Sequence, residues 1–305
     1  MNRRSMLLMT TALGAGAVAM HTSDSPAQQK QRAGGGRSSF IQRTDGTTLY
    51  YKDWGTGSPV VFVNSAGLTS DMWGYQMIPL TAQGLRCVAY DRRGHGKSSD
   101  PGRGYDFDTL ADDLAAVIET LDLRNITLVG HSMGCAEITR YLTRHGSSRI
   151  TRVALLSPTT PFLLKTPDNP EGLDRSAFQA LRATWLKDHP KWMADNTDSF
   201  FVPGTSDAMK RWGNSMIYTT SLQVQMACNV AITETDFRQE LTRIKVPVLI
   251  IHGTHDVSAP LALTATRTAK LIPGCRLEVY EGAPHGLFIT HMERVNEDLL
   301  KFMGR

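Results

Sequence analysis

The sequence predicts an α/β protein with a mostly parallel central sheet flanked by helices and a helical cap inserted between two strands. Three observations lead to this fold. From about residue 40 onward, short apolar runs alternate with longer amphipathic stretches, as in the strand–helix repeats that build parallel sheets. The apolar runs are nearly continuous in Val, Ile and Leu, which is typical of strands covered on both faces. The alternation breaks once, where helical patterns replace strands over residues 157–242.

Each apolar run is expected to form one strand. The expected strands are residues 47–54, 59–64, 85–90, 126–130, 153–156, 246–252 and 276–280. The expected helices of the core are residues 109–121, with Asp108 as the cap, and residues 132–145, 261–271 and 295–302. In such an alternation the carboxyl ends of the strands share one edge of the sheet, where ligands and reacting groups gather.

The chain divides into four expected segments. Residues 1–38 form a leader and a flexible linker, residues 39–156 and 243–305 form the two parts of the core, and residues 157–242 form the cap. The cap segment is interrupted by Pro and Gly turns and concentrates Trp, Phe and Met. Such an insertion between two core strands is best read as a cover over the carboxyl edge of the sheet.

Charge is unevenly distributed along the chain. Lys and Arg total 33 against 29 Asp and Glu, and five basic residues with one acidic residue in the first 38 positions account for the whole net charge of +4. The remainder is therefore neutral. Binding to nucleic acid needs a concentrated basic surface, so we expect no nucleic-acid partner.

The first 20 residues indicate export. Arg3 and Arg4 precede a mildly apolar run, residues 6–20, that is too short and too weakly apolar for a comfortable membrane span. This segment resembles a bacterial twin-arginine signal, and residues 17–19 (AVA) provide a cleavage site. The expected destination is the periplasm or the medium, without stable membrane association after cleavage. An uncleaved anchor and a chance basic start are the alternatives.

The four cysteines are scattered and form no C-x-x-C pair. Cys87 and Cys135 lie inside apolar segments, so we expect buried thiols rather than a disulfide framework. Export through the twin-arginine route delivers folded protein, so an oxidising destination does not by itself imply disulfides.

The strongest local motif is Gly130-His131-Ser132-Met133-Gly134. It follows a predicted buried strand and opens a predicted helix, which is the context that the G-x-S-x-G motif requires. The turn is too tight for side chains at the flanking positions, and the helix N-terminus favours negative charge developing at the serine. Ser132 is therefore the predicted nucleophile.

A serine nucleophile needs a base and a carboxylate that orients the base. Among nine histidines, His285 lies on a short loop after the last predicted strand, at the carboxyl edge. Asp256 follows the preceding strand and gives the chain order Ser, Asp, His. We predict His285 as base and Asp256 as acid, with Asp91 as the rival acid. His252 and His255 alone are a weak metal signal, and we expect no metal.

Two backbone N–H groups are needed to stabilise the developing oxyanion. Met133 follows the nucleophile and should supply one. Ala66, in the small-residue loop after the strand at residues 59–64, should supply the other, with an ordinary surface turn as the alternative. The residues expected to contact substrate are Asn64 and Ser65 of this loop and Trp185 and Trp212 of the cap.

From about residue 47 to residue 302 the chain resembles the cofactor-free haloperoxidases and aryl esterases of the α/β-hydrolase superfamily. The resemblance rests on residues 90–98 (YDRRGHGKS), 128–134 (LVGHSMG), 233–237 (TETDF) and 280–286 (YEGAPHG). It implies the α/β-hydrolase fold and the same triad, Ser132, Asp256 and His285. One departure is the loop at residues 64–67 (NSAG), which is similar to that of 3-oxoadipate enol-lactonases, whereas the family usually carries His-Gly followed by an aromatic residue.

The expected function is hydrolysis of small-molecule carboxylic esters through an acyl-enzyme, without cofactor. Lactone hydrolysis and perhydrolysis or haloperoxidation on the same triad are the alternatives within enzymes. A ligand-binding protein on the same scaffold is the alternative from another class, because a fold does not fix a function. The natural substrate and the oligomeric state do not follow from the sequence.

Overall fold

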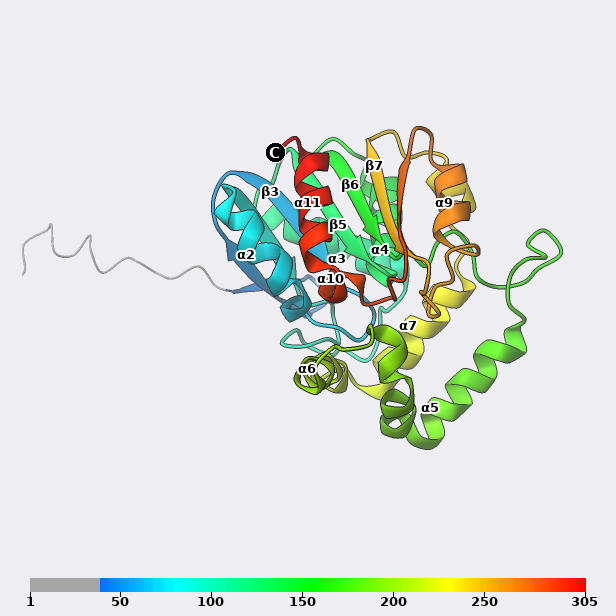
Figure 1. The fold of residues 1–305 in the computed structure, drawn as a ribbon. Helices are drawn as coiled ribbons and strands as arrows, with labels where there is room; N and C mark the ends of the chain where they lie inside the picture. Colours follow the sequence, from blue (N-terminus) through cyan, green and yellow to red (C-terminus); the bar gives the residue numbers. More distant parts are fainter. Residues whose placement is uncertain (1–38) are drawn as a thin grey trace, which may run out of the picture. The chain divides into compact units, whose positions relative to one another are not determined.

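A sheet of eight strands organises residues 39–305, the part of the chain that the computed structural model describes (Figure 1). The predicted export signal and linker, residues 1–38, lie outside the described residues. The spatial order of the strands is β1-β2-β4-β3-β5-β6-β7-β8. Their bounds are β1 Phe40–Gln42, β2 Thr48–Trp54, β3 Ser58–Val63, β4 Leu85–Tyr90, β5 Ile126–His131, β6 Ile150–Leu156, β7 Val248–Gly253 and β8 Arg276–Tyr280.

The strand directions agree with the predicted fold class. β1 pairs antiparallel with β2, and β2 pairs antiparallel with β4, whereas every pair from β4 to β8 is parallel. Each of the seven predicted strands is present within a few residues of its expected bounds. The short β1 had no apolar run to indicate it, and it is added at the antiparallel edge. The mostly parallel sheet of an α/β protein is confirmed.

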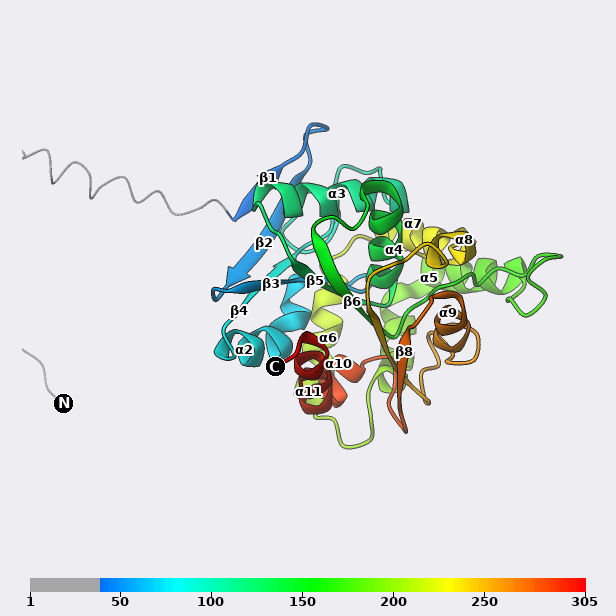
Figure 2. The ribbon, with the colours of Figure 1, turned by 90° about the horizontal axis from the view of Figure 1, so that it is seen from above.

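Helices cover both faces of the sheet, as Figure 2 shows from above. In β3, Val61 and Val63 pack on one face, and Val60 and Phe62 on the other, as the alternation of side chains along a strand requires. The first face is covered by α3 (Phe107–Thr120), α4 (Met133–His145) and α9 (Ala265–Leu271). The second is covered by η1 (Ser70–Trp73), α2 (Gly74–Ala82), α10 (Leu287–Thr290) and α11 (Met292–Met303).

The segment between β6 and β7 is helical and lies beyond one end of the sheet (Figure 1). It consists of α5 (Arg175–Asn196), η2 (Thr197–Phe200), α6 (Asp207–Tyr218), α7 (Leu222–Glu234) and α8 (Arg238–Leu241). The segment has an apolar cluster of its own, made by Phe162, Leu163, Leu164 and Phe178. We refer to α5–α7 and η2 as the cap helices.

One local prediction is wrong. The cap of α3 is Asp106, whose side chain accepts a hydrogen bond from the N–H of Thr109, and not Asp108. A capping side chain precedes the first helical residue and reaches the N–H three residues on. Asp108 lies one residue inside the helix, where its carboxylate forms ion pairs with Arg140 and Arg144 of α4.

The cysteines behave as expected. Cys87 and Cys135 are free and buried, as is Cys228, and burial raises the pKa of the Cys87 thiol to about 12. In residues 39–305, none of the helices combines the length and apolar character needed to cross a membrane.

Candidate active site

Ser132 lies in a tight turn between β5 and α4. Its backbone has φ +55° and ψ −115°, a conformation that is uncommon for a residue with a side chain and that presents the hydroxyl at the helix N-terminus. The flanking positions have no room for side chains. A Cβ atom at Gly130 would lie 2.8 Å from the carbonyl carbon of Gly134, and one at Gly134 would lie 2.3 Å from the carbonyl oxygen of Val63. The motif therefore reflects close contact between α4 and the end of β3.

A chain of hydrogen bonds joins Ser132, His285 and Asp256. His285 Nδ1 lies 2.7 Å from Asp256 Oδ2, and His285 Nε2 lies 2.9 Å from Ser132 Oγ. Asp256 follows β7 and His285 follows β8, so both loops leave the same carboxyl edge of the sheet at which β5 ends. All three side chains are buried. In this arrangement the Nδ1–H group donates to the carboxylate, and Nε2 accepts the serine proton.

The carboxyl group of Asp256 is held in its charged form. Burial alone would raise the pKa of Asp256, but the His285 imidazole and hydrogen bonds to the carboxylate outweigh it and lower the pKa below its ordinary value. The second oxygen, Oδ1, accepts from the N–H of Ala259 at 2.7 Å. An ionised carboxylate in this position fixes the orientation and tautomer of the imidazole.

Two more buried histidines support the loops that carry these groups. His131 Nε2 lies 2.8 Å from the carbonyl oxygen of His285. His252 Nε2 lies 2.8 Å from the carbonyl oxygen of Ala259 and 3.3 Å from Asp256 Oδ2. Burial lowers the pKa of both imidazoles, and for His131 the neighbouring His285 lowers it further. Both rings are therefore neutral at pH 7 and donate through Nε2–H.

The loop after β3 holds the predicted oxyanion donor. The N–H of Gly67 donates to His95 Nε2 at 3.1 Å, and His95 Nδ1 lies 3.0 Å from the carbonyl oxygen of Arg93, so Nδ1 carries the proton. Burial lowers the pKa of His95 to about 3, which keeps the ring neutral. The N–H of Gly67 is thus already used. Among the described residues, neither the N–H of Ala66 nor that of Met133 donates to another group.

A buried arginine ties this loop to the helix of the nucleophile. The Arg92 guanidinium donates to the carbonyl oxygens of Asn64 at 2.8 Å and Ser65 at 3.2 Å, and through Nε to Glu137 of α4 at 2.8 Å. Glu137 also accepts from the hydroxyl of Tyr90. These hydrogen bonds point the carbonyl groups of Asn64 and Ser65 toward Arg92. They also hold the loop in a fixed position relative to α4.

Comparison with known proteins places the chain in a family. A family profile described as alpha/beta hydrolase fold matches residues 58–292. The chain belongs to the alpha/beta hydrolase fold family. This hydrolase is 38% identical over 268 residues to a non-heme chloroperoxidase of Kitasatospora aureofaciens, covering 86% of this chain and 98% of that one. It is 35% identical over 274 residues to a bifunctional esterase/perhydrolase of Acinetobacter calcoaceticus, covering 87% and 99%.

Solved structures give the same result. An esterase of Exiguobacterium antarcticum has a TM-score of 0.84 at 32% identity, covering 88% of the hydrolase and 99% of that chain. The enol-lactonase of Burkholderia xenovorans LB400 has a TM-score of 0.68 at 26% identity, covering 87% and 100%. The predicted resemblance to haloperoxidases and esterases is confirmed, and an ester-hydrolysing enzyme is consistent with these relatives.

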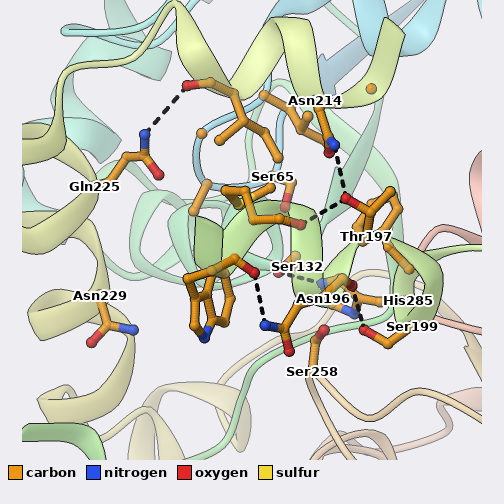
Figure 3. A pocket seen from close by; sticks show the side chains of 18 of the residues that line it. Ser65, Ser132, Asn196, Thr197, Ser199, Asn214, Gln225, Asn229, Ser258 and His285 are labelled. Atoms are coloured by element: carbon orange, nitrogen blue, oxygen red, sulfur yellow. Dashed lines mark hydrogen bonds between the residues drawn. The ribbon is translucent and has the colours of Figure 1, made fainter. Parts of the chain in front are cut away.

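A pocket of about 480 Å³ opens over Ser132 and His285 (Figure 3). Its floor includes the loop after β3, and its walls come from the cap helices, with Asn214 on α6 and Gln225 and Asn229 on α7. Its size lies within the range of ligand-binding sites. Lys, Arg, Asp and Glu are absent from the lining residues, all of which lie in the described part of the chain. The pocket is therefore suited to a neutral, largely apolar molecule.

Two of the predicted substrate contacts do not face this pocket. Asn64 is buried, its amide nitrogen donating to the carbonyl oxygen of Tyr90 at 2.8 Å and its amide oxygen accepting from Trp73 Nε1 at 2.9 Å. Trp212 packs edge-on against Tyr75, with ring centroids 5.8 Å apart. Both predictions are therefore wrong. Asn64 stabilises the loop after β3, and Trp212 packs α6 against Tyr75.

The remaining predicted substrate contacts, Ser65 and Trp185, line the pocket, as does the predicted oxyanion donor Ala66. The rival acid, Asp91, does not approach His285, because its two oxygens accept from the N–H groups of Ser70 at 2.6 Å and Lys97 at 2.8 Å. Asp91 therefore stabilises the turns at Ser70 and Lys97, next to the loop after β3.

Sequence reasoning missed several residues that shape the site. The position of His131 next to Ser132 indicates no role for its side chain, yet its ring reaches the carbonyl oxygen of His285. Arg92 lies in the motif at residues 90–98, and the motif alone does not indicate that its guanidinium ties the loop after β3 to α4. His189 of α5 lines the pocket with Trp185 and Trp192, and the pattern W-x₃-H-x₂-W was the available signal. Within residues 39–305, no three His, Cys, Asp or Glu side chains form a group able to hold a metal.

Proposed function

We propose that this protein hydrolyses carboxylic esters through an acyl-enzyme, with Ser132 as nucleophile, His285 as general base and Asp256 as the group that orients it. The observation that carries the proposal is the continuous hydrogen-bond chain from Asp256 Oδ2 through His285 to Ser132 Oγ at the floor of the pocket. The esterases among its relatives support the same reaction.

The proposed reaction starts when Ser132 Oγ attacks the ester carbonyl and its proton passes to His285 Nε2. The tetrahedral oxyanion receives hydrogen bonds from the N–H groups of Met133 and Ala66. His285 then protonates the leaving alcohol, and the acyl group stays on Ser132. Water, deprotonated by His285, releases the acid and restores the serine.

The lining of the pocket supports a neutral substrate. A hydrolysable enol-lactone of 3-oxoadipate keeps one free carboxylate, and the lining residues offer no Lys or Arg to pair with it. Burial of an unpaired charge is unfavourable. Esters and neutral lactones of apolar acids or alcohols are therefore the proposed substrate class.

Substitution of the nucleophile tests the reaction. Ser132→Ala should lower kcat on p-nitrophenyl acetate by very roughly 10⁶, the scale known for triad nucleophiles. A fluorophosphonate probe should label wild type at Ser132 and leave the variant unlabelled. Retention of most activity by the variant would refute the proposal. Absence of labelling in folded wild type would favour a binding protein on a hydrolase scaffold.

Perhydrolysis is the second candidate, favoured by the 35% identity to a bifunctional esterase/perhydrolase. In that reaction hydrogen peroxide instead of water attacks the acyl-enzyme, giving a peracid and free Ser132. Product analysis with p-nitrophenyl acetate, with and without peroxide, separates the two. Peracid formed in proportion to peroxide and abolished by Ser132→Ala would establish perhydrolysis, and acetate alone would exclude it.

A further inference from the structure

Four side-chain amides line the cavity, those of Asn196, Asn214, Gln225 and Asn229. The nitrogens of the first three donate to other groups of the protein. The amide of Asn229 is oriented differently, because its oxygen Oδ1 accepts from Arg182 Nη1 at 3.1 Å. A guanidinium only donates, so the amide oxygen must face Arg182 and Nδ2 must face the other way. Figure 3 shows Nδ2 of Asn229 on the side of the cavity.

The nitrogen of Asn229 is within reach of a ligand. Nδ2 forms no hydrogen bond to any residue of 39–305, yet it is accessible to solvent, unlike Trp185 Nε1 and His189 Nε2 of the same cavity. Arg182 is itself held by an ion pair with Glu234 at 3.7 Å, which fixes the amide from the side away from the cavity. Asn229 therefore presents one oriented hydrogen-bond donor to the cavity.

Gln225 lies one helical turn before Asn229, on the same face of α7. Its Nε2 donates to the carbonyl oxygens of Thr220 at 2.9 Å and Ile217 at 3.3 Å, which fixes the amide and leaves Oε1 as an acceptor. Oε1 has no partner among the described residues and is accessible to solvent. In Figure 3 it lies on the cavity side of the Gln225 amide. One face of α7 therefore presents an acceptor followed by a donor.

The acceptor is the nearer of the two to the reacting centre. A Cβ atom at Gly67 would lie 3.9 Å from Gln225 Oε1, and Thr220 Oγ1 donates to the carbonyl oxygen of Gly67 at 3.2 Å. Gly67 follows Ala66, the proposed oxyanion donor. Four residues of a helix rise about 6 Å, so Asn229 lies about one turn farther along α7. A chain that extends from the attacked ester along α7 meets the acceptor first and the donor second.

The separation of the two atoms selects the ligand group. The Gln225 amide is hydrogen-bonded to residues that precede α7, and the Asn229 amide is held by α5, so the two atoms are separated by more than the rise of about 6 Å. One hydroxyl oxygen bonded to both would place them about 5 Å apart. A trans amide points its N–H and C=O in opposite directions and spans about 8 Å between its two partners. An amide is also neutral, which suits a cavity without charged side chains.

Beyond Asn229 the cavity is apolar. α5 consists of two helical segments joined at Asp188, whose backbone is extended (φ −162°, ψ 82°). The first segment lines this end of the cavity with Phe178 and Leu181, and α7 adds Ile232, which packs on the same small apolar cluster as Phe178. A hydrocarbon chain attached to the carbonyl carbon of the amide would be removed from water against these side chains.

We propose that Gln225 Oε1 and Asn229 Nδ2 form a subsite for a secondary amide of the substrate, the first accepting from its N–H and the second donating to its C=O. The preferred substrates are then neutral esters that carry an N-acylamino group, with the nitrogen toward the ester and the acyl chain in the apolar end of the cavity. The amide is bound and not cleaved. As an assignment of substrate class, this inference rests on the proposed ester hydrolysis, but the subsite is testable without turnover.

The test measures binding to the Ser132→Ala variant by titration calorimetry. The ligands are the methyl esters of N-hexanoylglycine, N-hexanoyl-β-alanine and N-hexanoyl-4-aminobutanoate, which vary the spacing between ester and amide. Each is compared with the ketone in which CH₂ replaces N–H (methyl 4-oxononanoate, 5-oxodecanoate and 6-oxoundecanoate). Each is also compared with the plain ester of the same length (methyl nonanoate, decanoate and undecanoate). Acetates of the matching N-hexanoyl amino alcohols, with their ketone and alkyl analogues, place the amide on the alcohol side.

Two affinity ratios separate the two contacts. The amide-to-ketone ratio reports on the N–H that Gln225 accepts, and the ketone-to-plain-ester ratio reports on the C=O that Asn229 binds. At one spacing the amide should bind most tightly and the plain ester most weakly. Gln225→Met should lower the first ratio by up to about tenfold and leave the second unchanged, as expected for the loss of one hydrogen bond. Asn229→Leu should lower the second ratio by a similar factor and leave the first unchanged.

Gln223→Met is the matched control for Gln225→Met. Gln223 lies on the same helix outside the pocket, where its Nε2 donates to the carbonyl oxygen of Gly102 at 3.2 Å, and its substitution should leave both ratios unchanged. Asn229→Asp keeps an oxygen for Arg182 and replaces the donor by a second oxygen. It should lower the ketone-to-plain-ester ratio, and it tests the donor even if one of the apolar substitutions prevents folding.

Three results would overturn the subsite. An amide that gains nothing on its ketone at any spacing, or a ketone that gains nothing on its plain ester, would show that the two atoms bind only water. Gains that survive both Gln225→Met and Asn229→Leu would place the contacts elsewhere. Failure of the proposed function would be seen separately, as wild type that binds these esters without hydrolysing p-nitrophenyl acetate.

Discussion

The floor of the active site and the wall formed by the cap helices use polar groups in opposite ways. On the floor, Asp256, His285, His131 and Arg92 are buried and hydrogen-bonded, and each holds another part of the site in position. On the wall, Trp185 Nε1 and His189 Nε2 are inaccessible to solvent and form no hydrogen bond within the part of the chain that the structure describes.

This difference indicates a division of roles. Groups that must keep one geometry through a reaction benefit from many fixed partners, because a rigid arrangement needs no reorganisation as charge develops. Groups that select a substrate need free hydrogen-bonding capacity, which a fully satisfied wall would lack. Three predictions test the floor side of this comparison, and an exposed ion pair on α5 provides the comparison from the wall side.

The largest effect is expected at Asp256. Asp256→Asn removes the carboxylate that selects the Nδ1–H tautomer of His285, and kcat on p-nitrophenyl acetate should fall about 10⁴-fold, the loss known for this change in a serine triad. Asp91→Asn is the control, since Asp91 contacts only backbone N–H groups of two turns. Asp91→Asn should mainly lower the free energy of unfolding and have a smaller effect on kcat. Equal losses of kcat in the two variants would contradict the assignment of the acid.

The next effect concerns the ion pair that links the loop after β3 to α4. Arg92→Met leaves Glu137 buried without its partner, and the free energy of unfolding should fall by about 3–5 kcal/mol, as for other broken buried pairs. Urea denaturation measures this change. Adding Glu137→Leu should restore part of the lost free energy of unfolding. It should not restore the catalytic rate on p-nitrophenyl acetate, because the carbonyl oxygens of Asn64 and Ser65 still lack their donor.

Lys191→Met, which breaks an exposed pair with Asp195 on α5, is the comparison from the wall side. It should change stability little, since exposed pairs contribute little. A similar loss in Lys191→Met and Arg92→Met would remove the distinction between a fixed floor and a loosely constrained wall.

The smallest effect on the floor side is a pH dependence caused by His95. Its pKa of about 3 in the folded protein lies below the value near 6.5 of an unfolded chain, so above pH 6.5 neither state is protonated. Below pH 6.5 the unfolded state gains a proton that the folded state does not, and the folded protein loses stability until the pH reaches about 3. His95→Gln should reduce the loss between pH 7.5 and 5 by about 2 kcal/mol.

Urea denaturation at the two pH values measures this difference. Gln has no proton to gain in this range, and its side-chain oxygen can still accept from the N–H of Gly67. Identical losses in wild type and variant would show that His95 does not stay neutral in the folded protein.

The parts of the fold and site predicted from sequence are those set by local pattern. The strands form where the sequence has continuous apolar runs. The turn at Ser132 is predicted by Gly130 and Gly134, because neither position has room for a side chain. The loops of Asp256 and His285 follow because the carboxyl ends of parallel strands meet at one edge.

The parts that were missed depend on contacts between distant segments. Asn64 was assigned to substrate because it lies in the right loop, but Tyr90 and Trp73 hold its side chain in the interior. Trp185 and Trp212 look alike in sequence, and only the packing of the cap helices turns one into the cavity. The break at Asp188 also obscured the pocket-facing side of α5, because two helical registers overlap in one stretch of sequence.

The close approach of Gly134 to the end of β3 has a consequence for how such an enzyme can diversify. Because a single added methyl group there would collide with the backbone, the nucleophile helix and the neighbouring loop leave almost no freedom for change. We therefore expect variation in substrate preference to arise in α5–α7, whose side chains border the cavity without touching the reacting atoms. Substitutions in the cap helices can give new substrate specificities while the catalytic residues at the edge of the sheet stay unchanged.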